Sequence, residues 1–297
     1  MTEARLRPLV LLLPLLALGA GAEPKFEGAR HLGPPLDGPP QRIVTLAPSL
    51  TETVLALGAG DRLVGVSRFD DFEAVRALPR VGGYLDPNLE AILALHPDLV
   101  LAEKSPGNEA VVRDLARLGV PVLVVRARTL AEVREMIVAV AGALGMEAAG
   151  RGLLARFDAG LRAAQRLGPT AGTVRALLVY GVTPLVVAGP GSFGAELLSL
   201  CGAKNAAASG TGAYPTWPLE RLIADPPDLI VVLSMTGTQD LGPLGRIERL
   251  RSRTVPLDAT DLARPGPGLV RGARMLCETL RDHAPAGRRA AEAGGAP

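Results

Sequence analysis

The chain has little of the chemistry that marks metal or catalytic sites. Its three histidines, His31, His96 and His283, are scattered over 297 residues, which disfavours a zinc or manganese centre. It has neither a Gly-Lys-Ser/Thr phosphate loop nor a Gly-x-Ser-x-Gly elbow, and no acid–base pair stands at a telling spacing. We therefore expect no metal site, no catalytic residues and no enzymatic activity.

Aromatic residues and charge of one sign are also scarce. Aromatics make up 3% of the chain and the formal net charge is +2. No basic cluster interleaved with aromatics is present, so nucleic acid is not an expected partner. The 48% of hydrophobic residues is ample for a core, and a chain of this length is expected to form two domains.

The N-terminus has the pattern of a cleavable signal peptide. Arg5 and Arg7 precede an apolar run from Leu9 to Leu18, and Ala20-Gly21-Ala22 follows it. The run is too short to span a bilayer, which takes about 20 apolar residues. No cysteine follows it, so the lipoprotein alternative lacks an attachment point. We expect cleavage after Ala22 and a soluble protein of the periplasm.

The chain has only two cysteines, Cys201 and Cys277. In an exported protein an isolated pair is more often oxidised than free, so a disulfide is the working interpretation. Two separate buried thiols are the alternative.

Two blocks of sequence occur twice, in the same order. Asn88–Val100 recurs as Pro218–Ile230, and each copy has a glutamate at the start of a short helix, a Pro-Asp turn and an apolar strand. Pro48–Ala59 is echoed by Ser192–Ala203. The repetition predicts a pair of related lobes.

Strands that alternate with helices predict an α/β fold, in which two similar lobes have mainly parallel sheets flanked by helices. Thr129 and Glu132 form a capping-box pattern that begins a helical connection. A helix expected at 147–167 would be about 30 Å long and would join the lobes rigidly. The expected divisions are a signal peptide at 1–22, a Pro/Gly-rich leader at 23–41, an N-terminal lobe at 42–128, a connecting segment at 129–168, a C-terminal lobe at 169–283 and a disordered tail at 284–297. Strands are expected at 43–46, 63–66, 99–102, 122–125, 174–180 and 229–233, and further helices at 51–57, 90–95, 111–118, 194–200, 219–224 and 268–280.

Several motifs carry a resemblance to a known family. They are Thr45–Ser49 with Thr51-Glu52, Val64–Ser67, Asn88–Glu90 with Pro97–Val100, and Cys201-Gly202 with Asn205. With these motifs the chain resembles the substrate-binding proteins of ABC importers, in the class that serves vitamin B12, haem and ferric siderophores. The resemblance covers 42–283 and implies two α/β lobes joined by one long helix, an ABC permease dimer of the inner membrane as partner, a monomeric protein, and no resident cofactor.

Within this family the chain is most similar to the cobalamin-binding members. Those members carry a Cys-Gly pair in the second lobe and a partner cysteine in the final helix, as Cys201 and Cys277 stand here. The resemblance therefore implies a disulfide between them and a corrinoid, vitamin B12, as the ligand.

The repeated glutamates Glu90 and Glu220 match the family positions that pair with arginines of the transporter. Two carboxylates set far apart would fix the orientation of docking as well as the attraction. The alternative is that each only starts a helix, where a negative charge is favourable by about 0.3 to 1 kcal/mol. Glu52 and Glu196 also repeat, but they lie inside expected helices and are interpreted as structural.

Most aromatic residues lie in loops beyond the expected strands. In open α/β sheets ligands bind past the carboxyl ends of the strands, and aromatic faces suit a large planar macrocycle. Simple packing is the alternative for any one of them. The expected aromatic ligand contacts are Phe69, Tyr84, Tyr180, Tyr214 and Trp217.

The identity of the ligand stays open between three classes. Cobalamin binders often have tryptophan where Tyr84 and Tyr214 stand here. Haem binders usually need a Tyr or His iron ligand, which Tyr84, Tyr180 or Tyr214 would supply. Siderophore binders usually place arginines in the cleft, and Arg68 or Arg264 would serve; Arg264 is included among the candidate ligand contacts.

Overall fold

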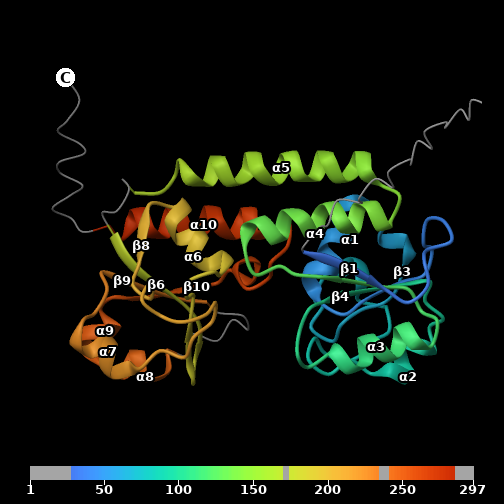
Figure 1. Cartoon of the computed structure of the whole chain (residues 1–297). Helices are drawn as coiled ribbons and strands as arrows, with labels where there is room; N and C mark the ends of the chain where they lie inside the picture. Colours follow the sequence, from blue (N-terminus) through green and yellow to red (C-terminus); the bar gives the residue numbers. More distant parts are fainter. Residues whose placement is uncertain (1–27, 170–173, 234–240, 285–297) are drawn as a thin grey trace, which may run out of the picture.

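The computed structural model describes residues 28–169, 174–233 and 241–284. The expected signal peptide at 1–22 lies outside the described residues, as does the expected tail from residue 285 onward. Two α/β lobes lie side by side, and one long helix runs above both (Figure 1). Within the described part, no helix has the length and apolar character needed to cross a membrane.

The N-terminal lobe is built on a five-stranded sheet in the order β1-β5-β4-β2-β3. Its strands are β1 (Ala29–Leu32), β2 (Ile43–Thr45), β3 (Leu63–Gly65), β4 (Leu99–Glu103) and β5 (Val122–Val125). Strands β2 to β5 are parallel, and their apolar runs are buried because helices cover both faces of the sheet. Helix α1 (Pro48–Leu57) covers one face, and α2 (Leu89–Leu93) and α3 (Glu109–Arg117) cover the other (Figure 1).

Strand β1 corrects one expected boundary. It lies in the stretch expected to be a leader, yet it pairs antiparallel with β5 from Ala29 opposite Val125 to Leu32 opposite Val122. The N-terminal lobe therefore begins before Arg42. The physical reason is that β5 would otherwise present an unpaired edge, which the leader covers by backbone hydrogen bonding.

The C-terminal lobe has a sheet in the order β10-β9-β6-β7, with β8 also paired to β6. Its strands are β6 (Val174–Val182), β7 (Leu185–Val187), β8 (Ala203–Asn205), β9 (Leu229–Leu233) and β10 (Thr254–Leu257). Among the described strands of this sheet, only β7 runs antiparallel to its neighbour. The helices are α6 (Phe193–Leu200) and α10 (Leu269–Asp282) on one face and α7 (Leu219–Ala224), α8 (Gly242–Arg246) and α9 (Glu248–Arg251) on the other (Figure 1). Short 3-10 turns are η1 (Gly60–Arg62), η2 (Glu73–Val75) and η3 (Thr260–Leu262).

The connection between the lobes is helical, as predicted. The Thr129 hydroxyl accepts a hydrogen bond from the Glu132 backbone N–H at 3.1 Å and so caps α4 (Leu130–Ala143). Gly145 has a φ of +67°, which a residue with a side chain rarely adopts, and it separates α4 from α5 (Glu147–Gln165).

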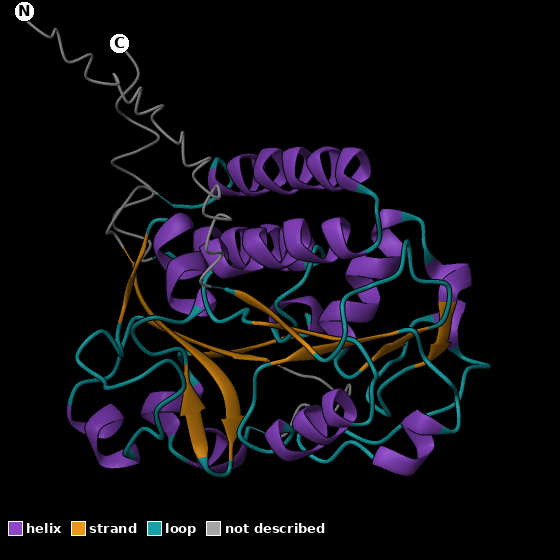
Figure 2. Cartoon of the chain, turned by 45° about the vertical axis from the view of Figure 1, so that its right-hand side comes forward, coloured by secondary structure: helices purple, strands orange, loops and turns teal. Residues whose placement is uncertain are grey.

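Helix α5 has 19 residues and is therefore about 28 Å long. It packs on α1 and α4 at one end and on α10 at the other (Figure 1). Figure 2 shows it as the outermost helix, above the other helices and the strands. Its buried residues Leu153, Phe157 and Leu161 belong to one apolar cluster that continues into both lobes. The lobes thus share a core along this side, which confirms the expected rigid connection.

The disulfide is present. Cys201 follows α6, Cys277 lies in α10, and their Cα atoms are 4.9 Å apart. Both residues are buried, so the bond ties together two helices that cover the same face of the C-terminal sheet.

Candidate functional site

Glu90 and Glu220 occupy equivalent places in the two lobes. Each lies in the first turn of a short helix, Glu90 in α2 and Glu220 in α7, on the side of the molecule opposite α5 (Figure 1). Both residues are exposed. Among the described residues neither carboxylate has a hydrogen-bond or ion-pair partner, and Asn88, not Glu90, caps α2. Two unpaired negative charges thus stand on the same side, one on each lobe.

Three aromatic rings of the C-terminal lobe pack together. Tyr180 lies near the end of β6, Tyr214 in the loop before α7, and Phe193 at the start of α6. The ring centroids of Tyr180 and Tyr214 are 5.3 Å apart, and each lies within 6.3 Å of the Phe193 centroid, all with edge-to-face geometry. Phe193 is buried, whereas Tyr214 keeps 41% of its surface exposed. The exposed face of this cluster is therefore that of Tyr214.

Tyr84 and Glu103 of the N-terminal lobe interact electrostatically with Tyr214 of this cluster. Burial raises the pKa of Tyr84, and the negative charge of Glu103 raises it further. Burial also raises the pKa of Tyr214, and Glu103 and then Tyr84 add to the effect. Tyr84 and Glu103 of the N-terminal lobe are thus close enough to affect the pKa of Tyr214 of the C-terminal lobe, and these three residues define the face between the lobes.

Glu103 is the residue of this face that the sequence did not reveal. It ends β4, a run of buried residues, and its Oε2 accepts a hydrogen bond from the Ser49 hydroxyl at 3.2 Å. Burial raises its pKa to about 7, the Ser49 hydroxyl lowers it, and the charge of Glu132 raises it. The sequence feature that could have identified Glu103 is a lone carboxylate at the carboxyl end of an apolar strand.

Tyr180 carries a hydroxyl that is enclosed and has no hydrogen-bond partner among the described residues. Burial raises its pKa well above the ordinary value, with the nearby Tyr214 as the second cause. A buried hydroxyl without a partner loses the hydrogen bonds it would make to water, and burial strongly favours its neutral form.

Two expected ligand contacts are placed elsewhere. Trp217 is only 5% exposed, because its backbone N–H donates to Leu185 and its ring packs in the core under α7, with the Arg221 guanidinium over it. Arg264 forms a bidentate ion pair with Asp71 of the other lobe, with both N–O distances 2.7 Å. A packed indole and a doubly paired guanidinium have little left to offer a ligand.

Phe69 and Arg68 lie on the rim of the N-terminal lobe. Phe69 is 54% exposed, and the Arg68 guanidinium lies 5.0 Å from its ring centroid. Arg68 also pairs with Asp86 at 2.9 Å. Phe69 therefore keeps a free apolar face, while the charge of Arg68 is already partnered.

The repeated glutamates Glu52 and Glu196 link the lobes. The Leu130 backbone N–H at the start of α4 donates to Glu196 Oε2 at 2.5 Å. Glu52 of α1 reaches the start of α10, where Arg271 Nη2 donates to its Oε1 at 3.2 Å. Burial raises the pKa of Glu52, opposed first by the Gly268 backbone N–H and then by Arg271. Each carboxylate thus approaches the first turn of a helix in or beside the other lobe.

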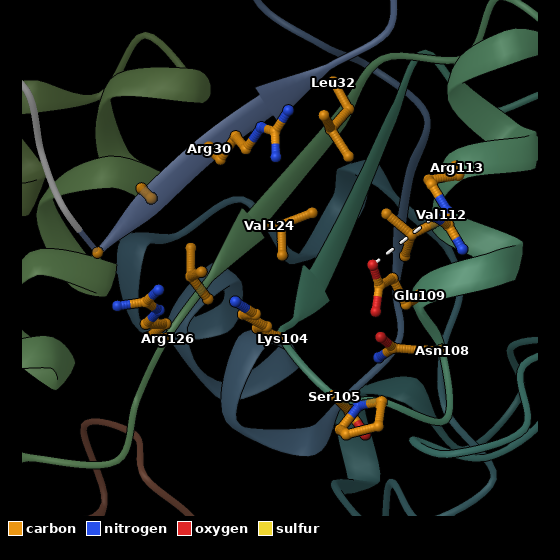
Figure 3. A pocket seen from close by; sticks show the side chains of 14 residues that line it. Arg30, Leu32, Lys104, Ser105, Asn108, Glu109, Val112, Arg113, Val124 and Arg126 are labelled. Carbon is orange, nitrogen blue, oxygen red and sulfur yellow. Dashed lines mark ion pairs between the residues drawn. The ribbon is translucent and has the colours of Figure 1, made fainter.

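Two pockets lie away from these faces. One, of about 360 Å³, lies between β1, β5 and α3, and none of the expected ligand contacts lines it (Figure 3). The other, of about 560 Å³, lies between α1, α5 and α10, beside Glu52 and Arg271. In the part of the chain that the structure describes, no group of three or more His, Cys, Asp or Glu side chains is placed to hold a metal ion.

Comparison with solved structures finds the same architecture. The periplasmic heme-binding protein RhuT from Roseiflexus sp. RS-1 matches with a TM-score of 0.72 and 28% identity, over 84% of this chain and 100% of that one. The periplasmic vitamin B12 binding protein BtuF of Vibrio cholerae matches with a TM-score of 0.70 and 26% identity, over 82% of this chain and 98% of that one.

Comparison of sequences leads to the same group. The vitamin B12-binding protein of Salmonella typhimurium is 30% identical over 249 residues, which are 80% of this chain and 90% of that protein. The model of the family described as "Periplasmic binding protein" matches residues 43–248. This is a family of substrate-binding proteins and not of enzymes, and the chain belongs to it.

Proposed function

We propose that the protein captures a corrinoid, vitamin B12, between its two lobes in the periplasm and delivers it to an ABC importer of the inner membrane. The proposal is supported by the family, by the relatives named as vitamin B12-binding proteins, and by the Cys201–Cys277 disulfide, which the resemblance to the cobalamin-binding members implied. Export through a signal peptide at 1–22 and a monomeric state belong to the same proposal.

The observation that carries the choice of ligand is the exposed ring of Tyr214 in the C-terminal lobe, with Tyr84 and Glu103 of the N-terminal lobe close enough to affect its pKa. A corrin is a large, slightly puckered ring with neutral amide groups on its rim. Tyrosine rings would contact its faces, and the Glu103 carboxylate would accept hydrogen bonds from amide N–H groups. Phe69 and Tyr180 complete the proposed contacts, while Trp217 and Arg264 act as supports of the lobes.

Haem is the second candidate, because solved relatives named as heme-binding proteins share the fold at 28% identity. One feature counts against it. Glu103, whose pKa is raised to about 7, would repel the haem propionates where it is ionised.

For delivery we propose that Glu90 and Glu220 dock on arginines of the permease. Both are exposed and unpaired among the described residues, and both stand on the side opposite α5. A guanidinium binds a carboxylate in bidentate fashion, and two such contacts, one on each lobe, would fix how the binding protein sits on a permease dimer.

Isothermal titration of the purified, oxidised protein with cyanocobalamin, and separately with haemin, tests the proposal. Saturable one-to-one binding of cyanocobalamin, with haemin bound weakly or not at all, is the expected result. Binding of haemin alone would move the ligand to haem, and binding of neither would leave a ferric siderophore as the remaining class of the family.

A further inference from the structure

The pocket between β1, β5 and α3 is lined mainly by positively charged side chains among its ionisable residues. Arg30 comes from β1, Lys104 follows β4, and Arg126 follows β5 (Figure 3). Within the described residues none of these three side chains has an ion-pair or hydrogen-bond partner. The pocket's fourth cation, Arg113, lies 3.8 Å from Glu109, the one carboxylate of the lining. The pocket therefore carries an excess of positive charge.

Arg126 differs from the other two cations in its burial. It is partly buried, whereas Arg30 and Lys104 are exposed. Among the other partly buried arginines of the described residues, Arg134, Arg175 and Arg264 pair with carboxylates at 2.6 to 2.7 Å, and Arg62 and Arg253 donate to backbone carbonyls at 3.2 and 3.0 Å. Arg126 is thus a partly buried arginine without a hydrogen-bond or ion-pair partner among the described residues, and an anion in the pocket would supply one.

The floor of the pocket is apolar. Val112 of α3 is 4% exposed, and Leu32 and Val124 are partly buried; all three turn their side chains toward the space between the helix and the strands (Figure 3). A volume of about 360 Å³ suits a small organic molecule. An apolar floor under a cationic rim fits a ligand with an apolar body and an anionic head.

The pocket backs onto the proposed ligand face. Asn108, which is 2% exposed, lines the pocket, and its Nδ2 donates to the backbone carbonyls of Tyr84 at 3.2 Å and Glu103 at 2.9 Å. Ser105 lines the pocket from the same loop. The pocket thus lies directly behind the loop that holds two residues of the face between the lobes.

We propose that this pocket is a binding site for a small organic anion, a carboxylate or phosphate monoester with an apolar body, held by Arg126, Lys104 and Arg30. It lies outside the faces between the lobes and does not depend on the identity of the captured ligand. The guanidinium of Arg126 and the ammonium of Lys104 donate hydrogen bonds to the anionic head, and Val112 and Val124 contact the apolar body.

Titration calorimetry with phenyl phosphate tests the proposal, with inorganic phosphate and phenol as separate titrants. We expect saturable one-to-one binding of phenyl phosphate with a Kd below about 1 mM. Arg126→Gln and Lys104→Gln should each raise that Kd about tenfold or more, since each removes a charged hydrogen-bond donor. Thermal unfolding of each variant establishes that it is folded.

Arg117→Gln is the matched control. Arg117 lies on the same helix α3, pairs with Asp114 at 3.1 Å and does not line the pocket. It removes the same charge and should leave the Kd unchanged. Absence of phenyl phosphate binding, an equal loss in Arg117→Gln, or inorganic phosphate binding as tightly as phenyl phosphate would each overturn the proposal, the last by reducing the pocket to an adventitious ion site.

Discussion

Glu196 of the C-terminal lobe accepts a hydrogen bond of 2.5 Å from the backbone N–H of Leu130, the first residue of α4. Its counterpart in the repeat, Glu52, lies against the first turn of α10. The duplicated sequence thus places one carboxylate in each lobe at the N-terminus of a helix that begins beside the other lobe, where backbone N–H groups lack helical partners.

Removal of the Glu196 carboxylate should weaken the contact between the lobes. We expect Glu196→Ala to lower the free energy of unfolding by about 1 to 2 kcal/mol, because the Leu130 N–H loses its partner. Glu196→Gln keeps an acceptor oxygen and should lose less. Urea denaturation of both variants measures the difference, and equal losses would show that the hydrogen bond is not the cause.

The disulfide should stabilise the C-terminal lobe without touching ligand binding. Cys201 and Cys277 are separated by 76 residues, so on the chain-entropy model loss of the bond lowers the free energy of unfolding by about 4.5 kcal/mol, and the double substitution to serine removes it. Denaturation with and without dithiothreitol measures this, and the serine variant serves as the control that dithiothreitol should not affect. A large loss of cyanocobalamin affinity in that variant would link the bond to the ligand face.

Glu103 should make stability depend on pH. Its pKa rises from an ordinary 4.5 to about 7 in the folded protein, so the folded state binds the proton more tightly than the unfolded state. Stability from this group is complete below pH 4.5 and falls as the pH rises through 7. Between pH 4.5 and 8 the loss is at most about 3 kcal/mol, at 1.36 kcal/mol per unit of pKa shift.

The comparison with Glu103→Gln isolates this group from other titrating residues such as Asp70, whose pKa burial raises to about 6. Denaturation of both proteins at pH 5, 6, 7 and 8 should give a steeper decline with pH in the wild-type protein. Parallel curves would show that Glu103 titrates near its ordinary value.

Tyr214 should contribute directly to ligand affinity. We expect Tyr214→Ala to weaken cyanocobalamin binding about tenfold or more, because a large exposed ring facing a macrocycle is the kind of residue that dominates binding energy. Ile223→Ala is the matched control: Ile223 is also 41% exposed, like Tyr214, but lies on α7. Similar affinities for the two variants in calorimetry would remove Tyr214 from the proposed face.

The docking glutamates should act on transport and not on capture. Glu90→Ala and Glu220→Ala should each reduce binding to permease-containing proteoliposomes and leave the Kd for cyanocobalamin within about twofold, since neither carboxylate touches the ligand face. Glu248→Ala, an exposed glutamate of α9, controls for general charge. Loss of ligand binding in purified Glu90→Ala or Glu220→Ala protein would contradict the assignment.

The elements that the sequence predicted best are those with continuous apolar runs. The strands at Val122–Val125 and Leu229–Leu233 and the helix at Leu219–Ala224 have the predicted bounds. Strands that are buried on both faces have unbroken runs of Val, Ile and Leu, so they can be predicted from the local sequence alone. Strand β1, with the sequence ARHL, lacks that signal and exists because β5, far along the chain, accepts it as a partner.

Side-chain roles were predictable only where the repeat or a motif marked them. The burial of Trp217 depends on its contact with β7, a short strand with no periodicity to announce it. The coupling of Glu103 with Tyr84 and Tyr214 joins three distant segments, and the pairing of Arg264 with Asp71 joins two lobes. Such contacts arise from how the lobes meet, which local spacing does not encode.

The antiparallel strand β1 also has a consequence for solubility. The edge it covers is β5, whose four residues Val122-Leu123-Val124-Val125 are all apolar. Without β1, the edge of β5 would have unpaired backbone donors and acceptors beside uncharged, apolar side chains. Such an edge can pair with a strand of another molecule. The exposed Arg30 and His31 put polar side chains on the outermost strand instead. An N-terminal truncation that extends past Gly28 and removes β1 is therefore expected to promote self-association, even with every residue of the ligand face intact.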